Sequence, residues 1–475
     1  MSFYNFRFTQ RSFLQHDGLP FADVLSDEAI QQVAEDVGLP PVDEDANDGV
    51  VYTTPVTLWA FLSQVLHRNE QRSCLAAVAR VIVLCIALGR EPCSDNTGAY
   101  CRARARLPLA LIQGLAYQIA ERAEAQVPED WLWKHKHVHL IDGTTVSTPD
   151  TGTLQAQYPQ PTAQKPGLGF PLVRMVVLIS LATAMVSGMA MGPYAGKETG
   201  ETALFRQLFD RLKPGNVVLA DRYFCSYFMI ALLRALGVDV VMRLHQGRSC
   251  DFRRGLRLGH GDHVVSWARP ARPAWMDQAT YDLMPESIDV REIHVQVSQR
   301  GFRVESLVVV TTLLDPDRYT IDDIAELYHR RWLIELDIRS LKITLGMDVL
   351  RCKTPAMVAK EIWTCLLAYN LIRQSMLQAA FLAELSPRQI SFTAAMQKVA
   401  ASWTTILVCD EERAGTMIDV HLRHLATHII GDRPDRVEPR AIKRRPKPHR
   451  LLTVPRPQAR AALLNGTATE PPIRR

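Results

Sequence analysis

The sequence lacks the features that mark a membrane or secreted protein. Its 475 residues contain no run of 18 apolar residues, and residues 1–15 have no apolar core of a signal peptide. Its nine cysteines are odd in number and form neither a C-x-x-C pair nor a zinc-finger spacing. These absences predict a cytoplasmic protein with reduced thiols and no membrane span.

Composition and net charge do not by themselves indicate a partner. Apolar residues make up 47% and charged residues 22%, which is ordinary for a globular protein, and the net charge is only +5. Basic residues concentrate near the C-terminus, where positions 433–460 hold ten Lys and Arg against Asp435 and Glu438. We therefore expect residues 431–475 to be a flexible or extended Pro/Arg-rich tail that attracts polyanions without specificity.

The N-terminal region, residues 1–130, is predicted to be helical. Residues 57–66 and 74–88 have helical patterns, and the second is so apolar that we expect it to be buried. Residues 94–106 end in alternating arginines, at 102, 104 and 106. Short helices with clustered arginines suit a DNA-binding module, and they suit a helical scaffold with surface arginines equally well.

Residues 131–350 follow an α/β plan. Strand patterns at 137–147 and 216–224 each carry one aspartate, Asp142 and Asp221, and a later strand pattern at 239–244 carries Arg243. Strands that alternate with helices after an initial strand cluster predict a mixed sheet flanked by helices. Each aspartate alone is more typical of a turn or a helix cap, but both are expected to follow buried apolar runs.

A helix is predicted from Thr320, a suitable N-cap, to Gly346, a suitable C-cap. At about 100° per residue, Tyr328, Arg331, Glu335 and Lys342 fall within about 60° of one another. Such a strip is most often a solvated face with ion pairs. Together with Asp142 and Asp221, however, Glu335 completes a set of three carboxylates that can hold two hard divalent cations for phosphoryl transfer.

The same residues resemble a known family. The spacing Tyr-x2-Arg-x3-Glu-x6-Lys is similar to the signature of DDE transposases of bacterial insertion sequences, the IS-four-like family. Residues 141–144 (Ile-Asp-Gly-Thr) and 220–224 (Ala-Asp-Arg-Tyr-Phe) resemble its first and second acidic motifs. The likeness spans about 131–375.

The resemblance implies an RNase H-like core in which Asp142, Asp221 and Glu335 are catalytic and bind Mg²⁺, as a two-metal site in which Mn²⁺ can substitute. It also implies DNA contacts by Tyr328, Arg331 and Lys342, and more weakly by Arg243.

The family carries a β-rich insertion between its second and third acids, and 114 positions separate Asp221 from Glu335 here. Residues 247–306 fit that insertion. Its tryptophans, Trp267 and Trp275, are expected to pack within a small subdomain, and the alternative is that Trp267 stacks on a base flipped out of the DNA. Some relatives have a tryptophan before the signature helix where residues 307–310 are Leu-Val-Val-Val, so this sequence does not predict a hairpin intermediate.

Residues 351–430 are predicted to be helical, with a broad apolar surface that either packs on the core or forms a dimer interface. The resemblance as a whole implies cut-and-paste transposition: cleavage at insertion-sequence ends and strand transfer into target DNA. The expected partners are terminal inverted repeats, target DNA and a second copy of the chain in a synaptic complex at the nucleoid. Two alternatives are a nuclease of the same core that no longer transposes and a non-catalytic DNA-binding regulator.

Overall fold

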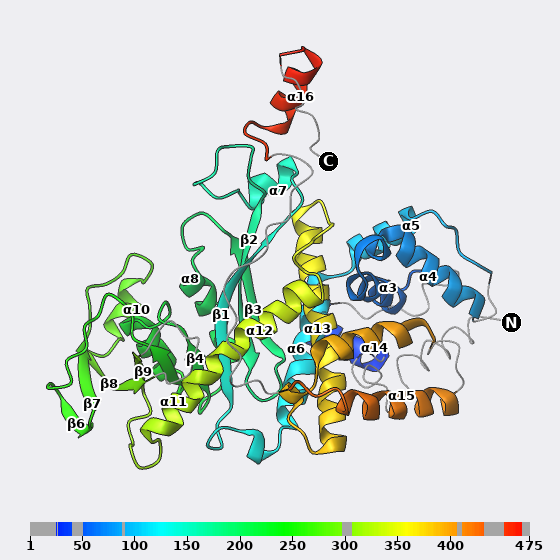
Figure 1. Ribbon diagram of the computed structural model, residues 1–475. Helices are drawn as coiled ribbons and strands as arrows, with labels where there is room; N and C mark the ends of the chain where they lie inside the picture. Colours follow the sequence, from blue (N-terminus) through cyan, green and yellow to red (C-terminus); the bar gives the residue numbers. More distant parts are fainter. Residues whose placement is uncertain are drawn as a thin grey trace.

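A nine-stranded sheet forms the centre of the molecule (Figure 1), which we describe from a computed structural model covering residues 25, 27–39, 51–87, 91–296, 306–405, 411–431 and 451–467. Its strand order is β3-β2-β1-β4-β5-β9-β8-β7-β6. The strands are β1 (Val138–Ser147), β2 (Leu172–Ser180), β3 (Val186–Pro193), β4 (Val217–Ala220), β5 (Asp239–Arg243), β6 (Leu256–Gly259), β7 (Asp262–Ala268), β8 (Ser287–Gln296) and β9 (Ser306–Thr311).

The first five strands have the order and directions of an RNase H-like core. β1, β2 and β3 form an antiparallel meander, whereas β4 pairs parallel to β1 and β5 pairs parallel to β4. The parallel strands are connected through helices, α8 (Glu201–Arg206) before β4 and α9 (Tyr227–Ala235) before β5. The predicted α/β class with a mixed sheet is thus confirmed.

The residues assigned to the β-rich insertion extend this sheet. β9 pairs antiparallel with β5, and β8, β7 and β6 follow in turn at the left of Figure 1. Helix α10 (Gln278–Asp282) lies between β7 and β8. Trp267, Met276 and Val290 of this part share one buried cluster with Phe224 and Tyr227, so the insertion and the core pack as one body.

The predicted signature helix is correct at its ends and wrong in its continuity. Thr320 accepts the backbone N–H of Asp323, whose carboxylate accepts the N–H of Thr320 in return, and Gly346 has a left-handed φ of 88°. Between these ends the chain forms α11 (Ile321–His329), the 3₁₀ turn η5 (Arg330–Trp332), α12 (Leu333–Arg339) and the π-helical turn η6 (Ser340–Thr344). Single π turns of this kind are frequent at functional sites.

Helices of the N-terminal and C-terminal regions pack together on the other side of the core, at the right of Figure 1. The long helix α13 (Pro355–Ala383) is largely buried and packs against α3, α6 and α15, so its apolar surface packs within the chain. The helices around it are α2 (Asp27–Asp36), α3 (Thr54–Leu66), α4 (Cys74–Ala87), α5 (Gly98–Arg106), α6 (Leu109–Ala125), α14 (Phe392–Thr405) and α15 (Glu411–Ala426).

Two expectations about these regions need correction. Helix α4 is not fully buried, because Leu75, Val83 and Ile86 are more than half exposed along one face. The expected tail contains the helix α16 (Arg456–Leu464), whereas positions 432–450 and 468–475, with most of the tail's basic residues, lie outside the described residues. No helix in the described part of the chain is long and apolar enough to span a membrane.

Candidate active site

Asp142 and Asp221 lie side by side because of the register between β1 and β4. The parallel pairs run from Val138↔Val217 to Leu140↔Leu219, and Asp142 and Asp221 each follow the last pair by two residues, close enough for the charge of Asp221 to raise the pKa of Asp142. The apolar run before Asp142 suggested that the strand ends there, but β1 continues in pairing with β2 to Ser147, so Asp142 lies within the strand. β4 ends at Ala220, which leaves Asp221 in the turn that follows.

Hydrogen bonds fix both aspartates. Asp142 Oδ1 accepts the N–H of Gly143 at 2.8 Å, and Asp221 Oδ1 accepts the N–H of Tyr223 at 2.8 Å. The pKa of Asp142 is raised to about 6, mainly by burial and in smaller part by the nearby carboxylates of Asp221 and Glu201, whereas the N–H of Gly143 and the charge of Arg331 act to lower it. This edge of the sheet therefore concentrates negative charge.

Glu335 reaches the same region from α12, which packs against β1. Its Oε1 accepts a hydrogen bond from Arg331 Nη2 at 2.9 Å. The opposite face of α12 is anchored by Asp337, a buried carboxylate that binds Arg373 at 2.7 Å and Arg388 at 2.9 Å. Because Asp337 follows Glu335 by two positions, this anchor fixes which way Glu335 points.

Tyr328 and Arg243 complete a cationic and phenolic layer beside the acids. Burial raises the pKa of Tyr328 to about 12, and Arg331 and Arg243 lower it while Asp221 raises it, so all three charges lie near its hydroxyl group. The raised pKa keeps the phenol neutral, as a hydrogen-bond donor, at physiological pH.

Lys342 joins the signature segment to the strand of Asp142. Its Nζ donates to Thr144 Oγ1 at 3.1 Å and to the carbonyl oxygen of Thr145 at 2.7 Å. Burial lowers the pKa of this ammonium group. Two of its three protons are thus directed at β1, and one remains for another acceptor.

The three acids share an oxygen-only donor set that suits hard divalent cations. Their ligand atoms do not all lie within 4.8 Å of one another. Among the described residues, the three side chains that do meet this distance are Cys250, His263 and Glu292. The guanidinium of Arg331 binds Glu335 and also lies close enough to Asp142 to lower its pKa.

Comparison with known proteins decides the family. Residues 133–371 match the family described as Transposase DDE domain. The chain is also 27% identical over 365 residues to the transposase InsG for insertion sequence element IS4 of Escherichia coli K12, an alignment that covers 71% of this chain and 77% of InsG. The chain belongs to the DDE transposases of the IS4 family.

Two further comparisons gave shorter or more distant matches. The transposase for insertion sequence element IS421 of Escherichia coli is 40% identical over 65 residues, or 14% of this chain and 18% of that protein. Among solved structures, the piggyBac transposase synaptic complex with hairpin DNA aligns with a TM-score of 0.40 at 10% identity, covering 90% of this chain and 85% of that one. This transposase is thus an enzyme of DNA transposition that acts on DNA, and its family uses divalent metal.

Glu201 is a fourth acid beside Asp142, and it was not predicted from the sequence. It begins α8 and packs directly on Gly143, where a Cβ would lie only 2.2 Å from its Cδ. Burial raises its pKa, and Asp221 raises it further. In the sequence Glu201 has the appearance of an ordinary first-turn helix acid. The one sequence feature that could have indicated Glu201 is Gly143, because a glycine at this position lets another side chain pack directly on the backbone after Asp142.

The two tryptophans of the insertion have different surroundings. Trp267 is only 6% exposed, donates from Nε1 to Glu292 Oε1 at 3.0 Å, and lies under the guanidinium of Arg248 at 3.9 Å. These are the surroundings of a packing residue. Trp275 is 36% exposed and lines a cavity of about 430 Å³ together with Tyr223 and Arg248.

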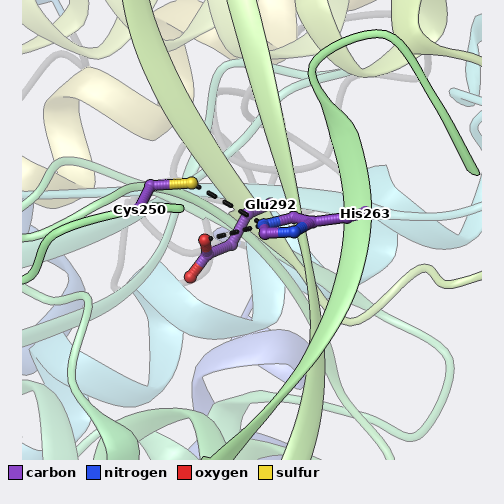
Figure 2. A group of neighbouring side chains, drawn as sticks. All are labelled: Cys250, His263 and Glu292. Carbon is purple, nitrogen blue, oxygen red and sulfur yellow. Dashed lines mark hydrogen bonds and ion pairs between the residues drawn. The ribbon is translucent and has the colours of Figure 1, made fainter. Parts of the chain in front are cut away.

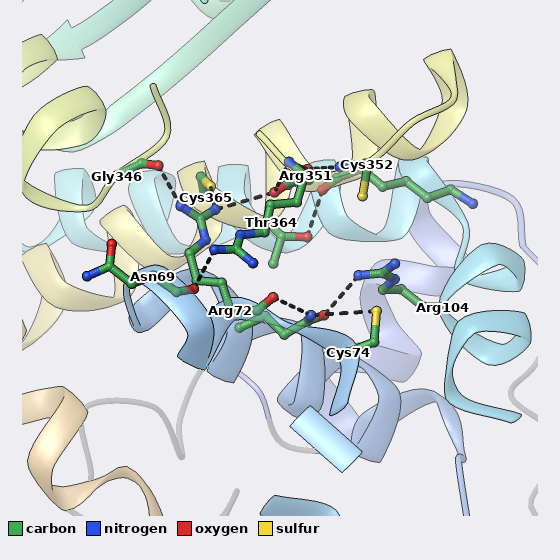
Figure 3. Close-up of polar contacts among 12 residues, drawn as sticks. Asn69, Arg72, Cys74, Arg104, Gly346, Arg351, Cys352, Thr364 and Cys365 are labelled. Atoms are coloured by element: carbon green, nitrogen blue, oxygen red, sulfur yellow. Dashed lines mark hydrogen bonds and ion pairs between the residues drawn. The ribbon is translucent and has the colours of Figure 1, made fainter. Parts of the chain in front are cut away.

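Arginines of the N-terminal region support the end of the signature segment (Figure 3). Arg68 donates to the carbonyl oxygens of Ile343 and Thr344, and Arg72 donates to that of Gly346 and binds Glu361. Cationic side chains stabilise a helix end whose carbonyls lack partners. Of the alternating arginines, Arg104 turns inward to Gln64, whereas Arg102 and Arg106 are exposed.

Proposed function

We propose that Asp142, Asp221 and Glu335 hold the divalent cations of this transposase, Mg²⁺ in the cell with Mn²⁺ able to substitute. The observation that supports this proposal is the parallel pairing of β1 with β4, after which Asp142 and Asp221 each follow by two residues, together with the packing of α12 against β1. The three carboxylates suit Mg²⁺ and Mn²⁺, because a hard cation stabilises the ionised form of Asp142, which is partly buried near other negative charges. Two such cations would activate the attacking water or hydroxyl and stabilise the leaving oxygen of a phosphodiester.

The basic and phenolic groups beside the acids are proposed to hold the scissile DNA strand. Arg331 and Arg243 offer guanidinium donors to phosphate oxygens, and Tyr328 offers a neutral hydroxyl donor. Lys342 keeps one proton for a phosphate while its other two bind β1. We do not include Trp267 in this set, because its ring is buried.

The proposed reaction has two in-line displacements without a covalent enzyme intermediate. Water attacks the phosphodiester at the element end, so that a P–O bond forms and the bond to the 3′ oxygen breaks, which frees a 3′-hydroxyl. That hydroxyl then attacks a target phosphodiester and displaces the adjoining 3′ oxygen. Asp142, Asp221 and Glu335 orient these groups, and the cationic residues prevent the strand from shifting.

The proposed substrates are the terminal inverted repeats of an insertion sequence and a target DNA. The proposal rests on the insertion-sequence relatives. A homodimer would bring the two ends together in one synaptic complex. Chromosomal DNA as substrate would place the reaction in the cytoplasm, at the nucleoid.

The test uses DNA carrying the inverted repeats that flank the gene, incubated with purified protein, Mg²⁺ and a target plasmid. The proposal predicts nicks with free 3′-hydroxyl groups, followed by joining to the plasmid. Glu335→Gln should abolish both, whereas Glu326→Gln, an exposed acid of the same segment paired with Arg330, should preserve both. Cleavage without joining would favour the nuclease alternative, and binding without cleavage would favour the regulator.

A further inference from the structure

Three side chains with metal-binding atoms converge within the insertion (Figure 2). Cys250 lies in the loop of residues 244–255 between β5 and β6, His263 lies on β7 and Glu292 lies on β8. His263 and Glu292 are direct cross-strand partners, so the sheet itself holds them on the same face. The loop places the thiol of Cys250 against the pair.

The distances match those of a tetrahedral metal site. His263 Nε2 lies 3.6 Å from Cys250 Sγ and 3.0 Å from Glu292 Oε2. At usual zinc bond lengths and tetrahedral angles, sulfur and nitrogen ligands lie about 3.5 Å apart and nitrogen and oxygen ligands about 3.4 Å apart. The first distance already fits, and the second needs to open by about 0.4 Å.

Neighbouring hydrogen bonds orient each ligand atom. The carbonyl oxygen of Arg254 lies 2.7 Å from His263 Nδ1 and can only accept, so Nδ1 carries a proton and Nε2 faces the group. Glu292 Oε1 is taken by the indole N–H of Trp267 at 3.0 Å, which leaves Oε2 for the group. Such outer partners are typical of metal-binding histidines and carboxylates.

The surroundings favour a bound cation. His263 is 1% exposed and Glu292 is 4% exposed, and the ring of Phe252 lies 4.7 Å from the imidazole ring. A buried carboxylate oxygen that faces an imidazole nitrogen needs a positive charge between them or on the ring.

We propose that Cys250, His263 and Glu292 bind a Zn²⁺ ion, with water as the fourth ligand. The mixed sulfur, nitrogen and oxygen donors select zinc over Mg²⁺, whereas the oxygen donors of Asp142, Asp221 and Glu335 select the reverse. The site is therefore chemically distinct from the proposed catalytic one.

The zinc ion would fasten the loop of residues 244–255 to the β7–β8 hairpin. That loop carries His245 and Arg248, which line the 430 Å³ cavity with Tyr223, two residues after Asp221. Arg248 also covers Trp267, whose N–H holds the ligand Glu292. The bound ion would thus hold the basic residues His245 and Arg248 in place at the wall of this cavity.

Cobalt substitution in the full-length protein tests the proposal independently of DNA cleavage. The chain is stripped with a chelator and titrated with Co²⁺. The expected result is one equivalent of tetrahedral Co²⁺ with a thiolate-to-cobalt charge-transfer band, displaced by one equivalent of Zn²⁺. A folded chain that gives no such band, or a band that Zn²⁺ does not displace, overturns the proposal.

Variants locate the site. Cys250→Ser should abolish the charge-transfer band, whereas Cys93→Ser, which removes a thiol from the N-terminal region, should leave it intact. Trp267→Phe removes the donor to Glu292 and should weaken Zn²⁺ binding about 10- to 100-fold. A band that survives Cys250→Ser contradicts the assignment. If Cys250→Ser does not fold, X-ray absorption of the zinc-loaded wild type decides, since a zinc shell without sulfur also contradicts it.

Discussion

The Nζ atom of Lys342 lies 2.7 Å from the carbonyl oxygen of Thr145, three residues beyond Asp142 on the same strand. Lys342 lies in the π turn at the end of the signature segment, and Thr145 lies on β1. This contact joins the segment that carries Glu335 to the strand that carries Asp142. The spacing between Glu335 and Lys342 therefore serves the assembly of the acids as well as the proposed grip on DNA.

Lys342→Ala should lower the rate of DNA cleavage about 10- to 100-fold, because it removes charged hydrogen bonds that contribute about 1.5–3 kcal/mol each. Cleavage rates at saturating DNA, measured beside the wild type, give this number. Lys353→Ala serves as the control, because Lys353 is exposed near the end of the same segment. Equal rates in the two variants would show that the contact to Thr145 has no part in the reaction.

Asp337→Ala should lower the free energy of unfolding by about 3–5 kcal/mol, because it leaves the buried guanidinium of Arg373 and the part-buried one of Arg388 without their carboxylate. Denaturant unfolding followed by circular dichroism measures the loss. Asp419→Ala breaks an exposed pair with Arg423 and should cost less than about 1 kcal/mol. If Asp337→Ala were as stable as Asp419→Ala, the anchor described for α12 would be unimportant.

Binding of Mn²⁺ at the acids should weaken as the pH falls below about 6. Asp142 has a pKa of about 6 without metal, so above that pH it is ionised and available, and below it a proton competes with the cation. Calorimetric titration should give a constant affinity above pH 7 and a loss of about tenfold per pH unit well below 6. Glu201→Gln removes a charge that raises this pKa and should move the onset to lower pH. An affinity unchanged between pH 8 and pH 5 would contradict the assignment of Asp142.

Gly143→Ala should destabilise the protein by about 1–3 kcal/mol, because the new Cβ would lie 2.2 Å from Glu201 Cδ. Combining it with Glu201→Ala should restore part of the loss, since the two changes act on one contact. Thermal unfolding of the single and double variants forms the cycle. Gly152→Ala, where a Cβ meets nothing within 4 Å, is the matched control. Additive effects of Gly143→Ala and Glu201→Ala would exclude the contact.

Much of this architecture could be predicted from local sequence. Thr320 with Asp323 forms a capping box, and the apolar runs around Asp142 and Asp221 form buried strands, because such patterns depend on neighbouring residues alone. The π turn at Lys342 could not be predicted, because it arises where the segment meets β1 and the N-terminal arginines.

Sites that combine residues far apart in the sequence could not be predicted either, because they depend on tertiary contacts. Glu201 lies 59 positions after Asp142 and looks like a helix-start acid, yet it lies against the residue that follows Asp142. Cys250, His263 and Glu292 have no recognisable spacing and meet only through the loop and the β7–β8 register. The burial of Trp267 depends likewise on Glu292 and Arg248.

The central claim is that Asp142, Asp221 and Glu335 bind the same cations, and iron-directed backbone cleavage tests it most directly. Fe²⁺ replaces Mg²⁺, and hydroxyl radicals formed at the bound iron cut the nearby backbone. The account predicts three clusters of cuts, near residues 142, 221 and 335, that compete with Mg²⁺ and disappear together in Asp142→Asn. Cuts near 221 and 335 that persist unchanged in Asp142→Asn, or cuts confined to other parts of the chain, would contradict it.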